Sequence, residues 1–209
     1  MTKIKLCGLT RPCDIEAANA IKPDYIGFVF APKSKRYVSP KNAAILRKKL
    51  DPTILAVGVF VNEEPETVAD LLRRNIIDIA QLHGSEDEAY IRRLRRLTDR
   101  PVMKAFRIET PSDLERAQNC SADLILLDSG SGGTGTVFDW KLLSSGDTNT
   151  RIFSRPYFLA GGLTSENVRQ AISCLSPYAV DISSGIETNG KKDASKMAAL
   201  VQAVRSMQT

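Results

Sequence analysis

Apolar segments and helical periodicities alternate along the whole chain. Eight short apolar segments recur about every 26 residues, and each is followed by a turn and a helical pattern. The segments cover residues 3–7, 25–30, 54–61, 77–82, 102–108, 123–127, 157–160 and 179–182. Between them, apolar residues are spaced three and four apart, as at Val68, Leu71 and Leu72. The pattern therefore predicts eight strands that alternate with helices.

The predicted strands are apolar at nearly every position. Strands of this kind are buried on both faces, which favours a parallel sheet covered by its crossover helices. Eight such units in 209 residues predict an α/β fold, a single-domain (βα)8 barrel over residues 1–209, rather than an open doubly wound sheet. After Asp128 only residues 140–143 have a helical pattern, so we expect the unit after strand six to be shortened.

Two sequence signals predict where helices begin. Ser39 followed by Pro40 places a capping hydroxyl before a proline at the first helical position. Ser85 and Glu88 have the spacing of a capping box. Both signals concern backbone structure and do not indicate a catalytic or binding role.

Composition and charge narrow the classes of function. With 43% apolar and 25% charged residues, the chain can bury a core without disulfides. No apolar segment approaches the roughly 20 residues of a membrane span, and no secretory signal is visible, so we expect a cytoplasmic protein. The net charge of +5 suits an anionic small molecule, and the basic run at 92–96 lacks the aromatic residues of a nucleic-acid surface.

Metal binding is not expected. The four cysteines, at positions 7, 13, 120 and 174, are too far apart for a paired-cysteine motif, and one histidine leaves a zinc site short of ligands.

The ends of the predicted strands carry the candidate chemistry, because barrels build their sites from the loops that follow the strands. Cys7 ends the first strand, and Asp128 follows the sixth. Lys5 shares the strand face of Cys7, so we expect its ammonium to favour the thiolate. The alternatives are a buried structural cysteine and an aspartate that caps a turn.

Glycines gather after the last three predicted strands. Loops after strands seven and eight commonly hold a phosphate in barrels, because glycine lets backbone N–H groups approach the anion. The alternative is that these glycines only form tight turns. The candidate phosphate-binding residues are Gly161, Gly162, Ser183, Ser184 and Gly185.

Three polar residues remain at strand ends. Arg36 could hold a carboxylate through two hydrogen bonds, although a lone arginine is more often a surface residue. His83 could act as an acid or base or be structural. Asp181 shares a strand face with Ser183, and a carboxylate there needs a partner, such as a substrate amine or hydroxyl.

The motifs KIKLCGLTR, SKRYVSP, QLHG, LLDSGSGGTGTVFDW, LAGGLTSENV and DISSGIETNGKKD resemble those of the phosphoribosylanthranilate isomerase family, in the family's order, from Lys3 to Asp193. The resemblance implies a (βα)8 barrel that acts in tryptophan biosynthesis without a cofactor. It implies conversion of N-(5′-phosphoribosyl)anthranilate to 1-(2-carboxyphenylamino)-1-deoxyribulose 5-phosphate by an Amadori rearrangement.

The resemblance also assigns roles to residues. Cys7 would be the general base, Asp128 the general acid, and Arg36 the ligand of the anthranilate carboxylate. Asp181 would lie near the substrate amine, and the glycine loops would hold the phosphate. The chemistry requires a protonated Asp128 and a basic Cys7, so we expect their pKa values to be displaced in opposite directions.

Three rivals remain at this stage. An indoleglycerol phosphate synthase would need catalytic lysines and a longer N-terminal segment, and the aminoaldose isomerase of histidine synthesis would carry an aspartate in place of Cys7. A non-catalytic barrel that binds a phosphorylated metabolite would keep the glycine loops alone. We also expect a monomer.

Overall fold

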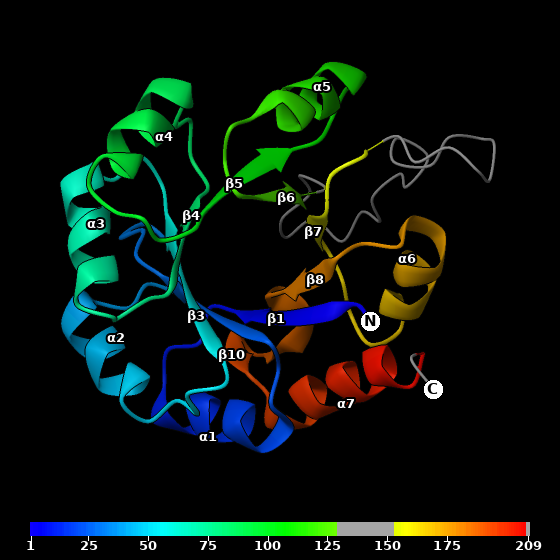
Figure 1. The fold of residues 1–209 in the computed structure, drawn as a ribbon. Coiled ribbons are helices and arrows are strands. Elements are labelled where there is room, and N and C mark those ends of the chain that lie inside the picture. The colour runs from blue at the N-terminus through cyan, green and yellow to red at the C-terminus, as the bar shows by residue number, and fades with distance from the viewer. Residues whose placement is uncertain (129–152, 208–209) are drawn as a thin grey trace.

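The computed structural model describes residues 1–128 and 153–207, which form a closed barrel of parallel strands (Figure 1). Each strand pairs with the next along the chain, and β1 pairs with β8 to close the barrel. The strands are β1 Lys3–Cys7, β2 Tyr25–Val29, β3 Leu55–Phe60, β4 Ile79–Leu82, β5 Val102–Arg107, β6 Leu124–Asp128, β7 Tyr157–Ala160 and β8 Ala179–Ile182. The predicted (βα)8 barrel is confirmed, and the predicted strand ends lie within two residues of those observed.

Helices form an outer ring around the barrel (Figure 1). They are α1 Pro12–Ile21, α2 Pro40–Arg47, α3 Pro65–Arg73, α4 Glu88–Arg95, α5 Pro111–Asn119, α6 Val168–Leu175 and α7 Ala194–Arg205. After β8 come a 3₁₀ turn, η2 Ser184–Ile186, and a small antiparallel pair, β9 Glu187–Thr188 and β10 Lys191–Lys192. The predicted short helix at 140–143 lies outside the described residues.

The two predicted helix caps have different outcomes. Ser39 caps α2, because its hydroxyl accepts a hydrogen bond from the backbone N–H of Asn42. The capping box at Ser85 is wrong: α4 is capped by Asp87, whose carboxylate accepts from the N–H of Tyr90. Ser85 instead donates its N–H to the side chain of Asn62, so the helix begins two residues later than that motif implies.

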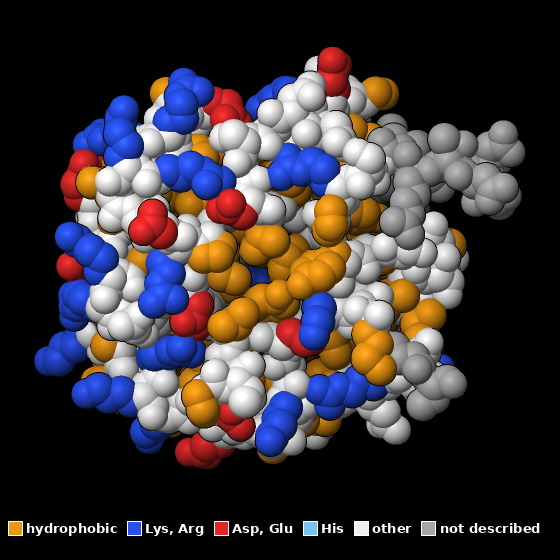
Figure 2. Space-filling model, viewed as in Figure 1, with side chains coloured by type: hydrophobic (Ala, Val, Ile, Leu, Met, Phe, Trp, Pro, Cys, Tyr) orange, Lys and Arg blue, Asp and Glu red, His pale blue; other side chains and the backbone are white. Residues whose placement is uncertain are grey.

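Apolar residues fill both sides of the strands. One large cluster lies between the strands and the helices, and a second fills the inside of the barrel. The inner cluster consists of Tyr25, Val57, Ile79, Met103, Ala105, Leu126, Phe158, Ala160 and Ala179. On the face in Figure 2, hydrophobic side chains gather at the centre and lysines and arginines are spread around the rim. No helix of the described ranges has the length and hydropathy to cross a bilayer.

Polar side chains also enter the barrel interior toward the carboxyl ends of the strands. Cys7, Val29 and Val59 form a small cluster at the carboxyl ends of their strands. Lys5 and Gln81 are also buried among the apolar side chains. Burial of an amide or an ammonium lowers stability unless the group is paired. Polar groups retained at this end of the barrel therefore indicate a functional site there.

Candidate active site

Cys7 and Asp128 lie at the same end of the barrel. They end β1 and β6, and these parallel strands are separated by β7 and β8. Cys7 packs with inward-facing Val29 and Val59, and Asp128 lies two residues beyond inward-facing Leu126. Both side chains are therefore carried on the inner face of the barrel mouth.

The thiol of Cys7 lies against a glycine on the neighbouring strand. A Cβ atom on Gly27 would lie only 2.7 Å from Cys7 Sγ, and the strand register pairs these two residues. Gly27 therefore leaves the space that the thiol occupies.

Gly27→Ala should lower the free energy of unfolding by about 1–3 kcal/mol, because the added methyl overpacks a filled site. Urea denaturation measures the change. In a Cys7→Ala background the 2.7 Å contact with Sγ is absent and only the contacts with the Cα and Cβ of residue 7, at 3.1 and 3.3 Å, remain, so the cost should be smaller. Equal costs in the two backgrounds would contradict this packing.

Burial dominates the electrostatics of Cys7. Desolvation raises the pKa of its thiol above the usual 9.0, although the ammonium groups of Lys5 and Lys192 act in the opposite direction. Lys5 therefore favours the thiolate, as expected, but burial outweighs its effect. The expected downward displacement of the Cys7 pKa is wrong for this structure, because the spacing of Lys5 and Cys7 predicts the effect of the charge but not the extent of burial.

Lys5 is held by a carboxylate on the adjoining strand. Its Nζ lies 2.9 Å from Asp181 Oδ2, and the side chain is fully buried. Burial lowers the pKa of Lys5, but Asp181 and Cys7 more than offset this effect, so the net pKa is raised. Asp181 Oδ1 has no hydrogen-bond partner among the described residues. This buried oxygen can accept a hydrogen bond from a ligand.

Asp128 faces the single histidine of the chain. His83 Nε2 lies 3.4 Å from Asp128 Oδ2, and His83 Nδ1 lies 3.0 Å from the side-chain nitrogen of Gln81. Gln81 and His83 are two residues apart on and just after β4, so they share a strand face. The structure thus brings His83 to the predicted site, and it adds Gln81, which the sequence analysis missed.

Arg36 reaches the mouth from the loop after β2. Its side chain crosses the backbone of Gly8, where a Cβ atom would lie 2.5 Å from Arg36 Cδ. Gly8 also has a φ of 82°, so glycine is needed there for two reasons. Arg36 therefore lies directly beside the residue that follows Cys7.

Two residues that the sequence analysis missed hold Arg36. Its Nε and Nη2 donate to the two carboxylate oxygens of Glu187, at 2.6 and 2.8 Å. Lys192 Nζ also donates to Glu187, at 2.6 Å, and to the carbonyl oxygen of Ser183. Both missed residues belong to the motif DISSGIETNGKKD, whose charged positions after the glycine were the available signal.

The glycine loops after β7 and β8 lie against each other. A Cβ on Gly185 would collide with the backbone oxygen of Leu163, so the two loops approach at backbone distance. Gly161 and Gly162 have φ angles of 99° and 62°, and a Cβ on Gly162 would meet no atom within 4 Å. Ser183 donates its hydroxyl to the carbonyl oxygen of Cys7, which links this region to β1.

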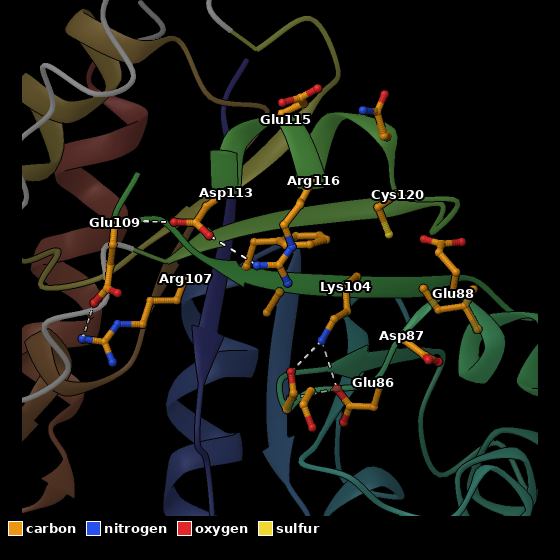
Figure 3. A pocket seen from close by; sticks show the side chains of 16 residues that line it. Glu86, Asp87, Glu88, Lys104, Arg107, Glu109, Asp113, Glu115, Arg116 and Cys120 are labelled. Carbon is orange, nitrogen blue, oxygen red and sulfur yellow. Dashed lines mark hydrogen bonds and ion pairs between the residues drawn. The ribbon is translucent and has the colours of Figure 1, made fainter. Parts of the chain in front are cut away.

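A cavity of about 760 Å³ lies elsewhere, between α4 and α5 on the outer side of β5 (Figure 3). Its lining includes Lys104, which is paired with Glu86, and Arg116, which is paired with Asp113. None of the predicted site residues lines it. The cavity is therefore separate from the chemistry at the barrel mouth.

Glu86→Gln should lower the free energy of unfolding by about 1.5–3 kcal/mol at pH 7, because Glu86 accepts hydrogen bonds from Lys104 and two backbone N–H groups. Burial raises the pKa of Glu86, but these bonds outweigh it and lower the net pKa below 4.5. The stabilisation is therefore present above pH 4.5 and is lost as the pH falls through the folded pKa. Urea denaturation at pH 7 and at lower pH should show the difference shrinking, whereas exposed Glu115→Gln should change neither value.

A sequence model of the family described as N-(5'phosphoribosyl)anthranilate (PRA) isomerase matches residues 4–203. The chain belongs to this family. The N-(5'-phosphoribosyl)anthranilate isomerase of Endomicrobium trichonymphae is 44% identical over 99% of the chain and 100% of that protein. The one from Thermoanaerobacter pseudethanolicus is 43% identical over the same shares.

Solved structures of the phosphoribosyl anthranilate isomerase family share the fold. The protein from Thermotoga maritima has a TM-score of 0.87 and 39% identity, covering 99% of this chain and 100% of its own. A second structure, with a TM-score of 0.85 and 38% identity over the same shares, is a complex with reduced 1-(o-carboxyphenylamino)-1-deoxyribulose 5-phosphate. The predicted resemblance to the family is confirmed.

Proposed function

We propose that this chain isomerises N-(5′-phosphoribosyl)anthranilate to 1-(2-carboxyphenylamino)-1-deoxyribulose 5-phosphate, as the names of its relatives indicate. The observation that carries the proposal is that β1 and β6 bring a thiol and a carboxyl to one barrel mouth. The reaction belongs to tryptophan biosynthesis, and we place it in the cytoplasm.

Asp128 is the general acid and Cys7 the general base. Opening the ribose ring requires a proton on the ring oxygen, while the anthranilate nitrogen supplies electrons to form an iminium. Removal of the C2′ proton by Cys7 then gives an enolamine, which relaxes to the ketone. The thiolate of Cys7 takes up this proton and becomes the thiol, and Lys5 and Lys192 stabilise the thiolate before the transfer. The electrons of the broken C2′–H bond move to the iminium nitrogen of the substrate, so the residues named here suffice without a cofactor.

Arg36 and Asp181 orient the substrate. Glu187 binds Nε and Nη2 of the Arg36 guanidinium, so Nη1 is left to donate to the anthranilate carboxylate. Asp181 Oδ1, buried beside Lys5, accepts from the substrate amine or a hydroxyl. The adjoining loops at Gly161, Gly162, Ser183, Ser184 and Gly185 hold the phosphate through backbone N–H groups.

Arg36→Met should weaken substrate binding by about 1.5–3 kcal/mol, roughly ten- to a hundredfold in Kd, because a charged hydrogen-bonding group is lost. Titration with a non-reacting product analogue gives Kd directly. Arg36→Lys keeps the charge but not the planar fork, so its Kd should lie between those of the other two proteins. An unchanged Kd in Arg36→Met would place the carboxylate elsewhere.

The test of the function is a loss of anthranilate fluorescence when the protein is added to freshly generated substrate. We expect turnover that falls by about 10²–10⁴-fold with Cys7→Ala. Binding of the product analogue without turnover by the unaltered protein would support a non-catalytic barrel and overturn the proposal.

We further propose that residues 1–209 act as a single domain and as a monomer. The large hydrophobic side chains exposed among the described residues, such as Ile45, Val61 and Leu97, lie on different parts of the ring. Sedimentation equilibrium should give the mass of one chain, 22.9 kDa. Twice that mass would mean a dimer, and the phosphoribosylanthranilate isomerase of Thermotoga maritima is described as dimeric.

A further inference from the structure

A buried glutamine lies beneath the barrel mouth. Gln81 is 1% exposed, and its Oε1 has no hydrogen-bond partner among the described residues. An unpaired buried amide oxygen is unfavourable, and an apolar side chain of similar size would avoid that cost. Among the described residues, the side chain of Gln81 makes one polar contact, 3.0 Å from its nitrogen to His83 Nδ1, and this contact indicates its role.

The contact defines the tautomer of His83. An amide nitrogen donates and does not accept, so Nδ1 of His83 must be the acceptor and the ring proton must lie on Nε2. Nε2 is 3.4 Å from Asp128 Oδ2. His83 therefore directs an N–H toward the carboxyl of Asp128.

The same contact opposes the charged form of His83. An imidazolium carries a proton on both nitrogens, and a proton on Nδ1 would face the N–H of Gln81. A positive charge beside Asp128 would favour the carboxylate, and a carboxylate has no proton to give.

We propose that Gln81 is a positioning residue that keeps His83 neutral, with its proton on Nε2, so that Asp128 can retain the proton it donates to the substrate. This inference rests on the proposed role of Asp128 as general acid. Gln81 acts through His83 and touches neither the substrate nor Asp128.

Among residues 1–128 and 153–207, three other cations on the strands of the barrel are paired. On β5, Arg107 is the register partner of Asp128, and its guanidinium lies 2.7 Å from Glu109. Lys104 pairs with Glu86 on the outer side of β5, and Lys5 of β1 pairs with Asp181 of the adjoining β8. Figure 3 shows the first two of these pairs. In the part of the chain that the structure describes, His83 lies in charge contact with Asp128, 3.4 Å away, so a change of its charge would act on Asp128 directly.

The first test measures the tautomer. The chain has one histidine, so protein labelled with ¹⁵N-histidine gives the signals of one imidazole. At pH 7 we expect the proton on Nε2 and an unprotonated Nδ1. A proton on Nδ1, either in the other neutral tautomer or in an imidazolium, would overturn the proposal, because Gln81 would then present its oxygen.

The second test uses Gln81→Glu, which replaces the donor by an acceptor of the same shape. We expect an imidazolium at His83, a fall in kcat of about tenfold or more at pH 7, and a shift to lower pH, by about one unit or more, of the limb of the pH–kcat profile that reports Asp128. Gln81→Met keeps the volume and should shift the limb less. A role in packing alone would lower kcat without moving the limb, and that result would overturn the inference.

A double variant separates the inference from simple damage. In Gln81→Glu with His83→Asn, no imidazolium can form, so kcat should recover relative to Gln81→Glu alone. Lack of recovery, with the product analogue still bound, would count against the proposal.

If Asp128→Asn turns over normally, the proposed function of Asp128 fails. If Asp128→Asn is inactive but Gln81→Glu keeps the original pH profile, this inference fails by itself.

Discussion

Cys7→Ala should lower kcat by about 10²–10⁴-fold while leaving the Kd of a product analogue nearly unchanged, because a proton-transfer group contributes about that much. The side chain removed is small and buried, so little binding surface is lost. The measurement is the initial rate of fluorescence loss together with a titration of the analogue.

In the unaltered protein, kcat/KM should rise with pH across the neutral range, because burial raises the pKa of the thiol above its usual 9.0.

The matched control is Cys174→Ala. Cys174 is an exposed cysteine of α6, away from the barrel mouth, so its replacement should leave kcat unchanged. Near-normal turnover in Cys7→Ala, with Cys174→Ala also normal, would assign the base to another residue. Comparison of thermal midpoints distinguishes lost chemistry from lost folding.

Asp128→Asn should lower kcat by about 10²–10⁴-fold for the complementary reason. Asparagine keeps the shape of the side chain but has no carboxyl proton to give to the ring oxygen of the substrate. The Kd of the analogue should stay close to that of the unaltered protein, because the amide still accepts and donates hydrogen bonds. Single-turnover kinetics would show whether ring opening has become the slow step.

Asp128→Glu is the control for this residue, because it keeps an ionisable carboxyl but moves it by one methylene group. It should retain more activity than Asp128→Asn. If both variants are equally inactive, the position of the carboxyl matters as much as its proton. If Asp128→Asn turns over at the normal rate, Asp128 is not the acid.

Most of the fold could be predicted from the hydrophobic pattern. The strands at 3–7, 157–160 and 179–182 have the predicted bounds, because strands buried on both faces leave an uninterrupted apolar segment. Ser85 shows where the pattern misleads. A capping-box spacing is a local signal, and it was overridden by Asp87, which lies closer to the helix, and by the contact of Ser85 with Asn62 on the neighbouring loop.

The candidate site was predicted in part. Strand periodicity placed Cys7, Lys5 and Asp181 on inner faces, and the structure adds that Lys5 is paired with Asp181. Glu187, Lys192 and Gln81 were missed, because their relevance depends on partners far away in sequence or on burial inside the barrel.

The sequence alone determined the order of the strands, the closure into a barrel and, to within two residues, the ends of each strand, because these follow from local periodicity and chain length. Only the tertiary structure decided the electrostatics. The pKa of Cys7 is raised because desolvation outweighs two nearby ammonium groups, and the side chain of Gln81 lies 3.0 Å from the imidazole of His83. Both effects depend on how much water is excluded and on distances across the barrel, which are set when all eight strands close around one interior.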